Sequence, residues 1–311
     1  MDLDIKIATR ESYGEKLAEL GEKNDKIVVF DADLAEATKT IIFKKKFPNR
    51  FFDMGIAEQD MVSTAAGMAT CGMIPFVSTF AVFAAGRAYD QIRNSICYPK
   101  LNVKICATHS GVSVGEDGAT HQMLEDLGLM RGLPNMTVLS VSDDIQTKWA
   151  IEEILKINGP VYVRLGRLKS PVIYNENQKF EIGKGIQIGN GNDATVIATG
   201  LMVSEAILAK EELEKQGINI RVVDIHTIKP IDRELIVKCA KETKRIITIE
   251  DHSIVGGLGS AVCEVLSEEY PTKVTRMGMK DTFGKSGKAE KLLDYFGLTK
   301  DAIIKEIKKD M

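Results

Sequence analysis

Apolar runs of strand length alternate with longer helical stretches in the first half of the chain. The expected strands lie at 27–31, 74–80, 103–107, 136–141 and 161–165. Helical patterns occupy 58–69 and 87–95, and Ser142 begins a third helix with Asp143 and Asp144 in its first turn, where acids suit the helix dipole. This alternation predicts parallel strands in an α/β layered fold.

A change in composition separates this half from a second series of the same kind. Residues 169–193 contain proline, asparagine and repeated glycine, and no helical periodicity runs through them. Further strands are expected at 194–199, 218–225, 245–250 and 273–276, with helices at 202–216, at 257–266 and twice near the C-terminus. We therefore predict an α/β protein with two consecutive three-layer α/β/α domains. The first, at 1–170, has a mostly parallel sheet, a linker covers 171–190, and the second domain covers 191–311.

The composition changes this picture little. Of 311 residues, 44% are hydrophobic and 27% charged, with a formal net charge of -3. That charge favours neither a nucleic-acid surface nor a membrane patch, and no apolar run reaches the roughly 18 residues of a membrane span. The N-terminus has no basic patch followed by an apolar core, so we expect no secretory signal. Five scattered cysteines indicate reduced thiols in a cytoplasmic protein.

Two glycine-containing segments resemble nucleotide-binding motifs only weakly. Gly257-Leu258-Gly259 lacks the full G-x-G-x-x-G pattern and is better interpreted as a tight entry into a helix. The segment 283–286 ends like a phosphate loop, but the preceding glycine has the wrong spacing. The four histidines form no close pair with cysteine or carboxylate partners, so we expect no metal site on this chain. His226 and His252 are expected to be structural.

The segment 109–122 is polar and rich in glycine. It carries His109 and His121, with Glu116 and Asp117 between them. Two imidazoles and two acids on a loop after a strand are typical of a site for a polyhydroxylated ligand, because α/β proteins place such sites at strand ends. A solvated loop is the alternative.

Glu58 begins a helix whose following residues are mostly small or apolar. A carboxyl group there could be desolvated, which would raise its pKa and allow it to donate a hydrogen bond. The alternative is a glutamate that only complements the helix dipole. Shortly after it, Phe80 and Phe83 stand three apart and could line a flat ring or pack in the core.

Taken together, these segments resemble the pyrimidine-binding and C-terminal domains of transketolase. The order is G-I-A-E-Q, then S-T-F-x-x-F, then H-S-x-x-x-x-G-E-D-G-x-T-H-Q, then G-P-V-Y-V-R-L-G-R at 159–167. Nearly the whole chain takes part, and four motifs in this order are highly specific. The resemblance identifies the chain as the C-terminal subunit of a split transketolase, which transfers a two-carbon ketol unit from a ketose phosphate to an aldose phosphate.

The resemblance implies thiamine diphosphate as the cofactor. Glu58 matches the glutamate that hydrogen-bonds the aminopyrimidine ring, and with His121 it is the expected catalytic residue. Phe80 and Phe83 match aromatics that pack on the ring, and Asp33 matches an acid beside the cofactor.

The resemblance also implies substrate contacts. Arg10 and Arg167 match phosphate-binding arginines, while His109, Asp117 and His121 match residues that contact sugar hydroxyls and phosphate.

Two positions depart from the family pattern. Ala37 stands where a phosphate-contacting serine is usual, with Thr38 beside it as a possible substitute. Gly86 stands where some members have a third ring-packing tyrosine.

Members of the family bind the cofactor's diphosphate through a metal ion, which is held by a G-D-G motif and a later asparagine. This chain has no G-D-G. The resemblance therefore implies that the Mg²⁺ ligands belong to a partner chain, an N-terminal subunit. The expected assembly is α2β2, and we expect it to bind neither nucleic acid nor membrane. Two other functions stay open: a β subunit of a 2-oxo-acid dehydrogenase E1 or a deoxyxylulose-phosphate synthase-like enzyme, and a non-catalytic scaffold subunit.

Overall fold

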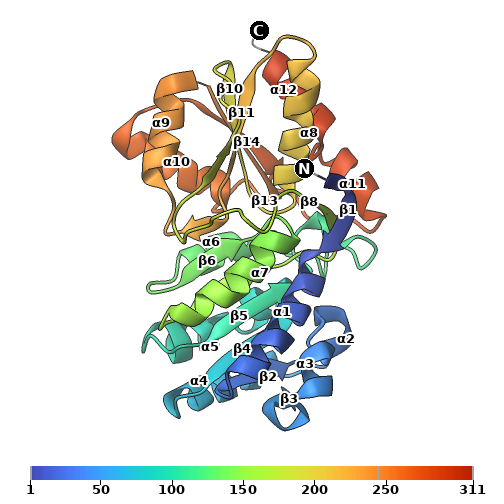
Figure 1. The fold of residues 1–311 in the computed structure, drawn as a ribbon, viewed down its shortest axis with the longest axis vertical. Helices are drawn as coiled ribbons and strands as arrows, with labels where there is room; N and C mark the ends of the chain where they lie inside the picture. The colour runs from blue at the N-terminus through green and yellow to red at the C-terminus, as the bar shows by residue number, and fades with distance from the viewer. Residues whose placement is uncertain (1, 244, 310–311) are drawn as a thin grey trace.

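The computed structural model describes residues 2–243 and 245–309, and three β-sheets organise this part of the chain (Figure 1). The largest sheet has seven strands, which are parallel to their neighbours except at one edge. In spatial order they are β12 (Thr227–Lys229), β6 (Thr137–Ser140), β7 (Val161–Arg164), β5 (Lys104–Thr108), β4 (Ile74–Phe80), β2 (Ile27–Asp31) and β3 (Phe51–Asp53).

Helices cover both faces of this sheet, so its central strands are buried throughout. Met61 and Ala65 belong to the apolar cluster on one face, and Tyr13, Leu17 and Ile151 belong to a second cluster. The helices of this half are α1 (Thr9–Lys23), α2 (Ala35–Thr38), α3 (Ile41–Lys46), α4 (Glu58–Thr70), α5 (Tyr89–Gln91), α6 (Asp126–Arg131) and α7 (Asp144–Glu153). Single 3₁₀ turns occupy η1 (Pro48–Arg50), η4 (Val112–Val114) and η5 (Ile154–Lys156).

The segment after β4 is helical but wider than an α-helix. Two π-turns, η2 (Val82–Arg87) and η3 (Ile92–Cys97), enclose α5, where the sequence predicted one helix at 87–95. Wide turns of this kind occur frequently at functional sites. Here the first turn places Phe83 and Arg87 on the same side, with the guanidinium carbon 4.5 Å from the centre of the phenyl ring.

The second sheet has five strands and lies above the first in Figure 1. Its order is β14 (Val274–Met279), β13 (Ile246–Ser253), β10 (Ala194–Ala198), β11 (Ile220–Asp224) and β9 (Ile186–Ile188). All neighbours are parallel except β9, which runs antiparallel to β11. The surrounding helices are α8 (Met202–Glu214), α9 (Arg233–Thr243), α10 (Leu258–Glu269), α11 (Ala289–Tyr295) and α12 (Lys300–Lys308). The α/β fold with a mostly parallel first sheet is therefore confirmed.

Three short strands cross the boundaries predicted between the first domain, the linker and the second domain. Strand β12, from the second half of the chain, pairs with β6 and completes the first sheet. Strand β9 lies inside the segment expected to be only a linker. The two-stranded sheet joins β1 (Asp2–Ala8) to β8 (Lys169–Val172), so the start of the chain lies against the end of the first domain. No helix within the described ranges is both long and apolar enough to cross a bilayer.

A buried arginine links the two sheets. The Nε of Arg164, at the end of β7, donates to both carboxylate oxygens of Asp126, 3.1 and 2.8 Å away. Its Nη2 donates to the backbone carbonyl of Asp251 on β13 at 2.8 Å. The Asp251 carboxylate in turn accepts from the backbone N–H of Val112 at 2.8 Å and from the hydroxyl of Ser113 at 2.6 Å. The loop after β5 is therefore fastened to the second domain.

This arrangement predicts that Gly111 tolerates no side chain. Its φ is +76°, and an added Cβ would lie 2.1 Å from Oδ2 of Asp251. We expect Gly111→Ala to lower the free energy of unfolding by about 2–4 kcal/mol in urea titrations of the isolated chain. Gly67→Ala is the matched control, because nothing lies within 4 Å of its added Cβ in α4, and it should stabilise by at most about 1 kcal/mol. Equal effects of the two substitutions would contradict the role of the Asp251 contact.

Candidate active site

The candidate residues gather where the parallel strands of the first sheet end. Phe80 closes β4, His109 follows β5 and Arg167 follows β7, while Glu58 begins α4 after β3. Because the carboxyl ends of parallel strands meet at one edge of a sheet, the fold brings these distant positions together. Asp33 lies at the same edge after β2, exposed, with its backbone N–H donating to Asp53 at 3.2 Å.

Glu58 is buried but has a partner that the sequence analysis did not name. Its side chain is 1% exposed, and its two carboxylate oxygens accept from Nη1 of Arg87 at 2.9 and 2.8 Å. The Arg87 side chain is 45% exposed, so it covers the carboxylate from the solvent side. In this chain the group therefore forms an ion pair with Arg87, where the sequence predicted a protonated acid that donates a hydrogen bond.

Two stacked phenyl rings lie near this carboxylate and are joined to it through Arg87. Phe80 and Phe83 have ring centroids 5.9 Å apart and planes within 11° of each other. Phe83 is partly exposed and carries the Arg87 guanidinium over its face. His121 meets Phe83 edge-on at 5.5 Å and Phe80 at 6.4 Å. The Arg87 guanidinium therefore lies over the Phe83 ring and contacts the Glu58 carboxylate at the same time.

His109 stacks on Phe80 with a centroid distance of 3.8 Å. Since a guanidinium can only donate, the 3.3 Å contact between Nη1 of Arg10 and Nε2 of His109 makes Nε2 the acceptor. The proton is then on Nδ1, which donates to the Thr108 hydroxyl at 2.9 Å. Burial, together with the nearby charges of Arg10 and Arg167, lowers the pKa of His109 to about 3. Both ring nitrogens are used within the chain, so His109 orients Arg10.

Arg10 and Arg167 are neighbours because the segments that carry them are hydrogen-bonded together. The backbone N–H of Gly166 donates to the Thr9 hydroxyl at 2.7 Å. Burial, and to a lesser extent the neighbouring Arg167, lowers the pKa of Arg10, although Glu11 opposes the shift. Asp117 lies 3.6 Å from Nη1 of Arg167, so the polar loop reaches the same place.

The departure at Ala37 is not compensated by Thr38. The Thr38 hydroxyl donates to the buried Asp31 at 2.7 Å and is fully enclosed, so it faces away from the arginines. The carbonyl of Ala37 instead accepts from Nη1 of Arg10 at 2.9 Å. Gly86 has open space around it, with no atom within 4 Å of an added Cβ.

The second domain also reaches the polar loop, through a segment that the sequence analysis had set aside. Nε2 of Gln122 donates to the carbonyl of Lys285 at 2.8 Å and to that of Gly115 at 3.1 Å. An added Cβ at Gly118 would lie 2.3 Å from Oγ of Ser286. The segment 283–286 therefore packs against the loop 115–122. Gln122 belongs to the T-H-Q motif, and this motif is the sequence feature that could have marked Gln122 as part of the site.

The other motifs have structural roles. The Glu250 carboxylate accepts from the backbone N–H groups of Leu258 and Gly259 at 2.6 and 2.8 Å, which explains the glycine-rich entry into α10. Burial raises the pKa of Glu250 to about 7. His252 is buried, accepts from Leu127 N–H at 3.2 Å and donates from Nδ1 to the Ser253 carbonyl at 2.7 Å.

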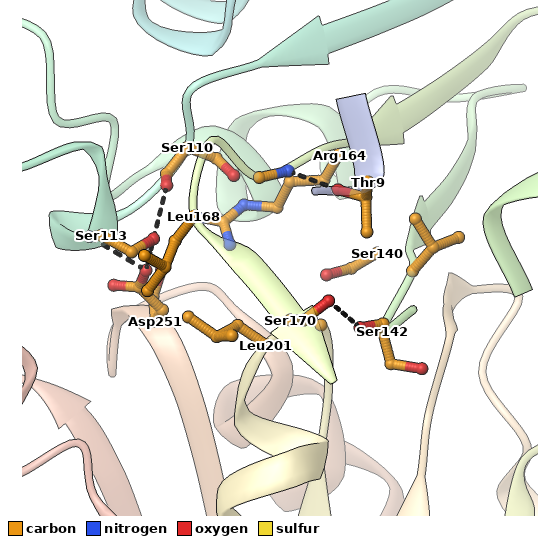
Figure 2. Close-up of a pocket in the computed structure, with 13 residues that line it drawn as sticks. Thr9, Ser110, Ser113, Ser140, Ser142, Arg164, Leu168, Ser170, Leu201 and Asp251 are labelled. Atoms are coloured by element: carbon orange, nitrogen blue, oxygen red, sulfur yellow. Dashed lines mark hydrogen bonds between the residues drawn. The ribbon is translucent and has the colours of Figure 1, made fainter. Parts of the chain in front are cut away.

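A small cavity of about 30 Å³ is lined by residues of both domains, including Arg164 and Asp251. Figure 2 shows the hydroxyl-bearing residues that line it, Thr9, Ser110, Ser113, Ser140, Ser142 and Ser170. The volume suits one or two water molecules and is too small for a sugar phosphate. All five cysteines are free thiols, and within 2–243 and 245–309 no group of three or more His, Cys, Asp or Glu is arranged to hold a metal ion.

Comparison with known proteins gives this geometry a family. The model for the transketolase pyrimidine-binding domain matches residues 5–172, and the model for the transketolase C-terminal domain matches residues 183–303. The chain belongs to the transketolase family. The resemblance found in the motifs is therefore confirmed.

Several transketolase relatives differ in how much of them this chain spans. It is 51% identical to a protein of Methanocaldococcus jannaschii described as a putative transketolase C-terminal section, over 97% of this chain and 96% of that protein. It is 42% identical to a 6-deoxy-6-sulfo-D-fructose transketolase subunit of a Clostridium species, over 95% and 92%. Human transketolase is 43% identical over 97% of this chain but only 49% of its own length.

A solved structure described as a split gene transketolase, inactive beta4 tetramer, superimposes with a TM-score of 0.91 and 53% identity. The match covers 97% of this chain and 98% of that one.

The environment of His109 predicts that its ring stays neutral in the folded chain. In the unfolded chain the imidazole titrates near its ordinary pKa of about 6.5, whereas in the fold the pKa is lowered to about 3. Its contribution to stability is therefore complete above about pH 6.5 and is lost as the pH falls toward 3. We expect ¹⁵N NMR of the ring to show the Nδ1–H tautomer from pH 8 to 5. A midpoint near 6.5 for the folded chain would contradict the assignment.

Proposed function

We propose that this chain is the C-terminal subunit of a split, thiamine diphosphate-dependent transketolase that moves a two-carbon ketol unit from a ketose phosphate to an aldose phosphate. The observation that carries the proposal is the buried Glu58 carboxylate beside the parallel rings of Phe80 and Phe83. Near-complete coverage of a separate C-terminal section, against about half of human transketolase, supports the role of a subunit.

The residues present fit the aminopyrimidine half of the cofactor. Phe83 is a partly exposed aromatic ring and Glu58 is a buried carboxylate, and displacement of the Arg87 guanidinium that contacts both would open them to an aminopyrimidine. When bound, thiamine diphosphate supplies the nucleophilic carbon for carbon–carbon bond cleavage and formation. The contribution of this chain is to hold the ring, exclude water from it and control the proton at its nitrogen.

Arg87 sets a condition on that proton. A carboxylate that accepts two hydrogen bonds from a guanidinium has no proton to donate, so Glu58 must part from Arg87 before it can serve a ring nitrogen. Arg87 is 45% exposed, so its guanidinium can exchange Glu58 for solvent without being buried unpaired. Arg87 thus keeps the buried charge paired while no ring is present.

Arg10 and Arg167 are the proposed receptors for the charged end of the sugar, because planar guanidinium groups bind tetrahedral oxyanions through paired hydrogen bonds. His109 holds Arg10 in place, and His121 and Asp117 stand between the ring surface and the arginines. The Clostridium relative carries a sulfonated sugar in its name, so phosphate and sulfonate are both oxyanions to be tested.

We further propose a partner and a location. An N-terminal transketolase subunit would bind the diphosphate through Mg²⁺ and complete an α2β2 assembly. Half-length coverage of human transketolase supports the need for such a partner. The solved split gene transketolase described as an inactive beta4 tetramer agrees with a C-terminal subunit that has no activity by itself. A cytoplasmic location agrees with five free thiols.

The competing functions receive less support. The relatives described above are transketolases or their sections, so the comparisons do not favour a dehydrogenase β subunit or a deoxyxylulose-phosphate synthase. A scaffold without turnover would not need a buried carboxylate beside an open aromatic face.

Glu58→Gln should abolish ketol transfer by the reconstituted complex. The amide keeps the size and still accepts a hydrogen bond, but it cannot exchange a proton, so kcat should fall by about 100-fold or more. Steady-state kinetics measure this, and size-exclusion chromatography verifies assembly. Glu211→Gln, on the exposed face of α8, is the control. Turnover near the wild-type rate would remove Glu58 from its role.

Arg167→Ala should raise the KM for phosphorylated sugars far more than the KM for hydroxypyruvate, an unphosphorylated donor. Loss of a charge-assisted contact to phosphate corresponds to an increase of about tenfold or more. Parallel kinetics with the two donors measure the difference. If both KM values rise equally, Arg167 does not hold the phosphate.

A further inference from the structure

The second domain lines one side of the cavity that holds both arginines. This open cavity of about 280 Å³ is bounded by Arg10 and Arg167 from the first domain and by Lys288, Ala289 and Glu290 from the segment at the start of α11. Ser113 and Leu168, labelled in Figure 2, also border it, so it lies next to the hydroxyl-lined cavity. Lys169, at the start of β8, is the fourth cation on its wall.

The charges on this wall are unbalanced. Four cationic side chains face the acidic Glu116 and Glu290, and Asp117 lies 3.6 Å from Arg167, which leaves an excess of one positive charge. Arg167 is 3.8 Å from Glu116, a loose contact. Among the described residues, neither Lys169 nor Lys288 has a carboxylate within 4.0 Å. The buried Nε of Arg10 also has no hydrogen-bond partner in the part of the chain that the structure describes.

The segment that carries the exposed Lys288 packs on the polar loop through its backbone. The segment is fixed at Lys285 by Gln122, and Gly287 lies against the loop, with its carbonyl 3.4 Å from an added Cβ at Gly115. Lys285 itself points elsewhere, since its Nζ donates to the hydroxyl of Tyr295 at 2.6 Å. Two lysines three residues apart therefore have different roles.

We propose that Lys288 is a specificity-determining residue of the second domain, which completes a four-cation pocket for the terminal phosphate dianion of the sugar. That the bound molecule is a sugar phosphate rests on the proposed function. That the pocket binds a phosphate group rests only on the residues that line it. A phosphate monoester carries about one and a half to two negative charges near neutral pH, whereas a sulfonate carries one, so a net-positive wall attracts phosphate more strongly. The pocket therefore favours phosphate over sulfonate.

The first test is kinetic and uses the reconstituted complex. With Lys288→Met, the ratio of kcat/KM for ribose 5-phosphate to that for uncharged glycolaldehyde should fall about five- to tenfold, as expected for one charge-assisted contact. The change should appear in KM rather than kcat. Lys288→Arg should restore most of the ratio, because the charge is retained. Lys285→Met is the matched control from the same segment and should leave the ratio unchanged.

The second test needs no partner, because all four cations belong to this chain. Titration of the isolated chain with inorganic phosphate, followed by ³¹P NMR, should show at least threefold weaker binding for Lys288→Met than for wild type or Lys285→Met. Methanesulfonate should bind wild type more weakly than phosphate does.

The outcomes separate the two proposals. An unchanged acceptor ratio in an active complex, or phosphate binding that is absent or independent of Lys288, overturns the role of Lys288. An inactive complex whose C-terminal subunit still binds phosphate through Lys288 overturns the transketolase function and leaves the anion pocket standing.

Discussion

A buried guanidinium joins the two sheets next to the candidate site. Arg164 lies at the end of a central strand, pairs with Asp126 and donates to the carbonyl of Asp251 on the other sheet. Asp251 then fixes the turn at Val112. Charges this deeply buried are tolerated only when every partner is present, and removal of one partner from such a pair costs about 3–5 kcal/mol. Together with the pairing of β12 with β6, this network sets how the loop after β5 lies against the second domain.

The charged groups of the candidate site differ in whether they have an oppositely charged partner. Arg87 is paired with Glu58, so the charge of this buried carboxylate is neutralised. Arg10 is held only by a neutral imidazole and a carbonyl, which leaves its charge available. His109 can act in this way because burial and two nearby cations lower its pKa. The same cleft thus offers a satisfied acid at one end and unsatisfied cations at the other.

The second domain does more than pack against the first. It contributes β12 to the first sheet, Asp251 to the interdomain network and Lys288 to the wall of the anion pocket. The chain spans both transketolase domains and about half the length of human transketolase, and the cavity beside Arg10 and Arg167 is lined from both of these domains. Phe83 and Arg87, by contrast, are partly exposed at the edge of the first domain.

The sequence alone determined the α/β alternation, the positions of most long strands and the motifs around Glu58, Phe80 and the loop of Asp117. These signals are local, because buried runs, helix starts and motif spacing can be read from neighbouring residues. The pairing of Arg87 with Glu58, across 29 positions, and the packing of Lys285 on Gln122, across 163, were decided only by the tertiary structure. No local pattern marks such contacts, because each depends on where separate elements meet. The sequence did not predict the three-residue β12 for the same reason, because so short a strand forms only by pairing with β6.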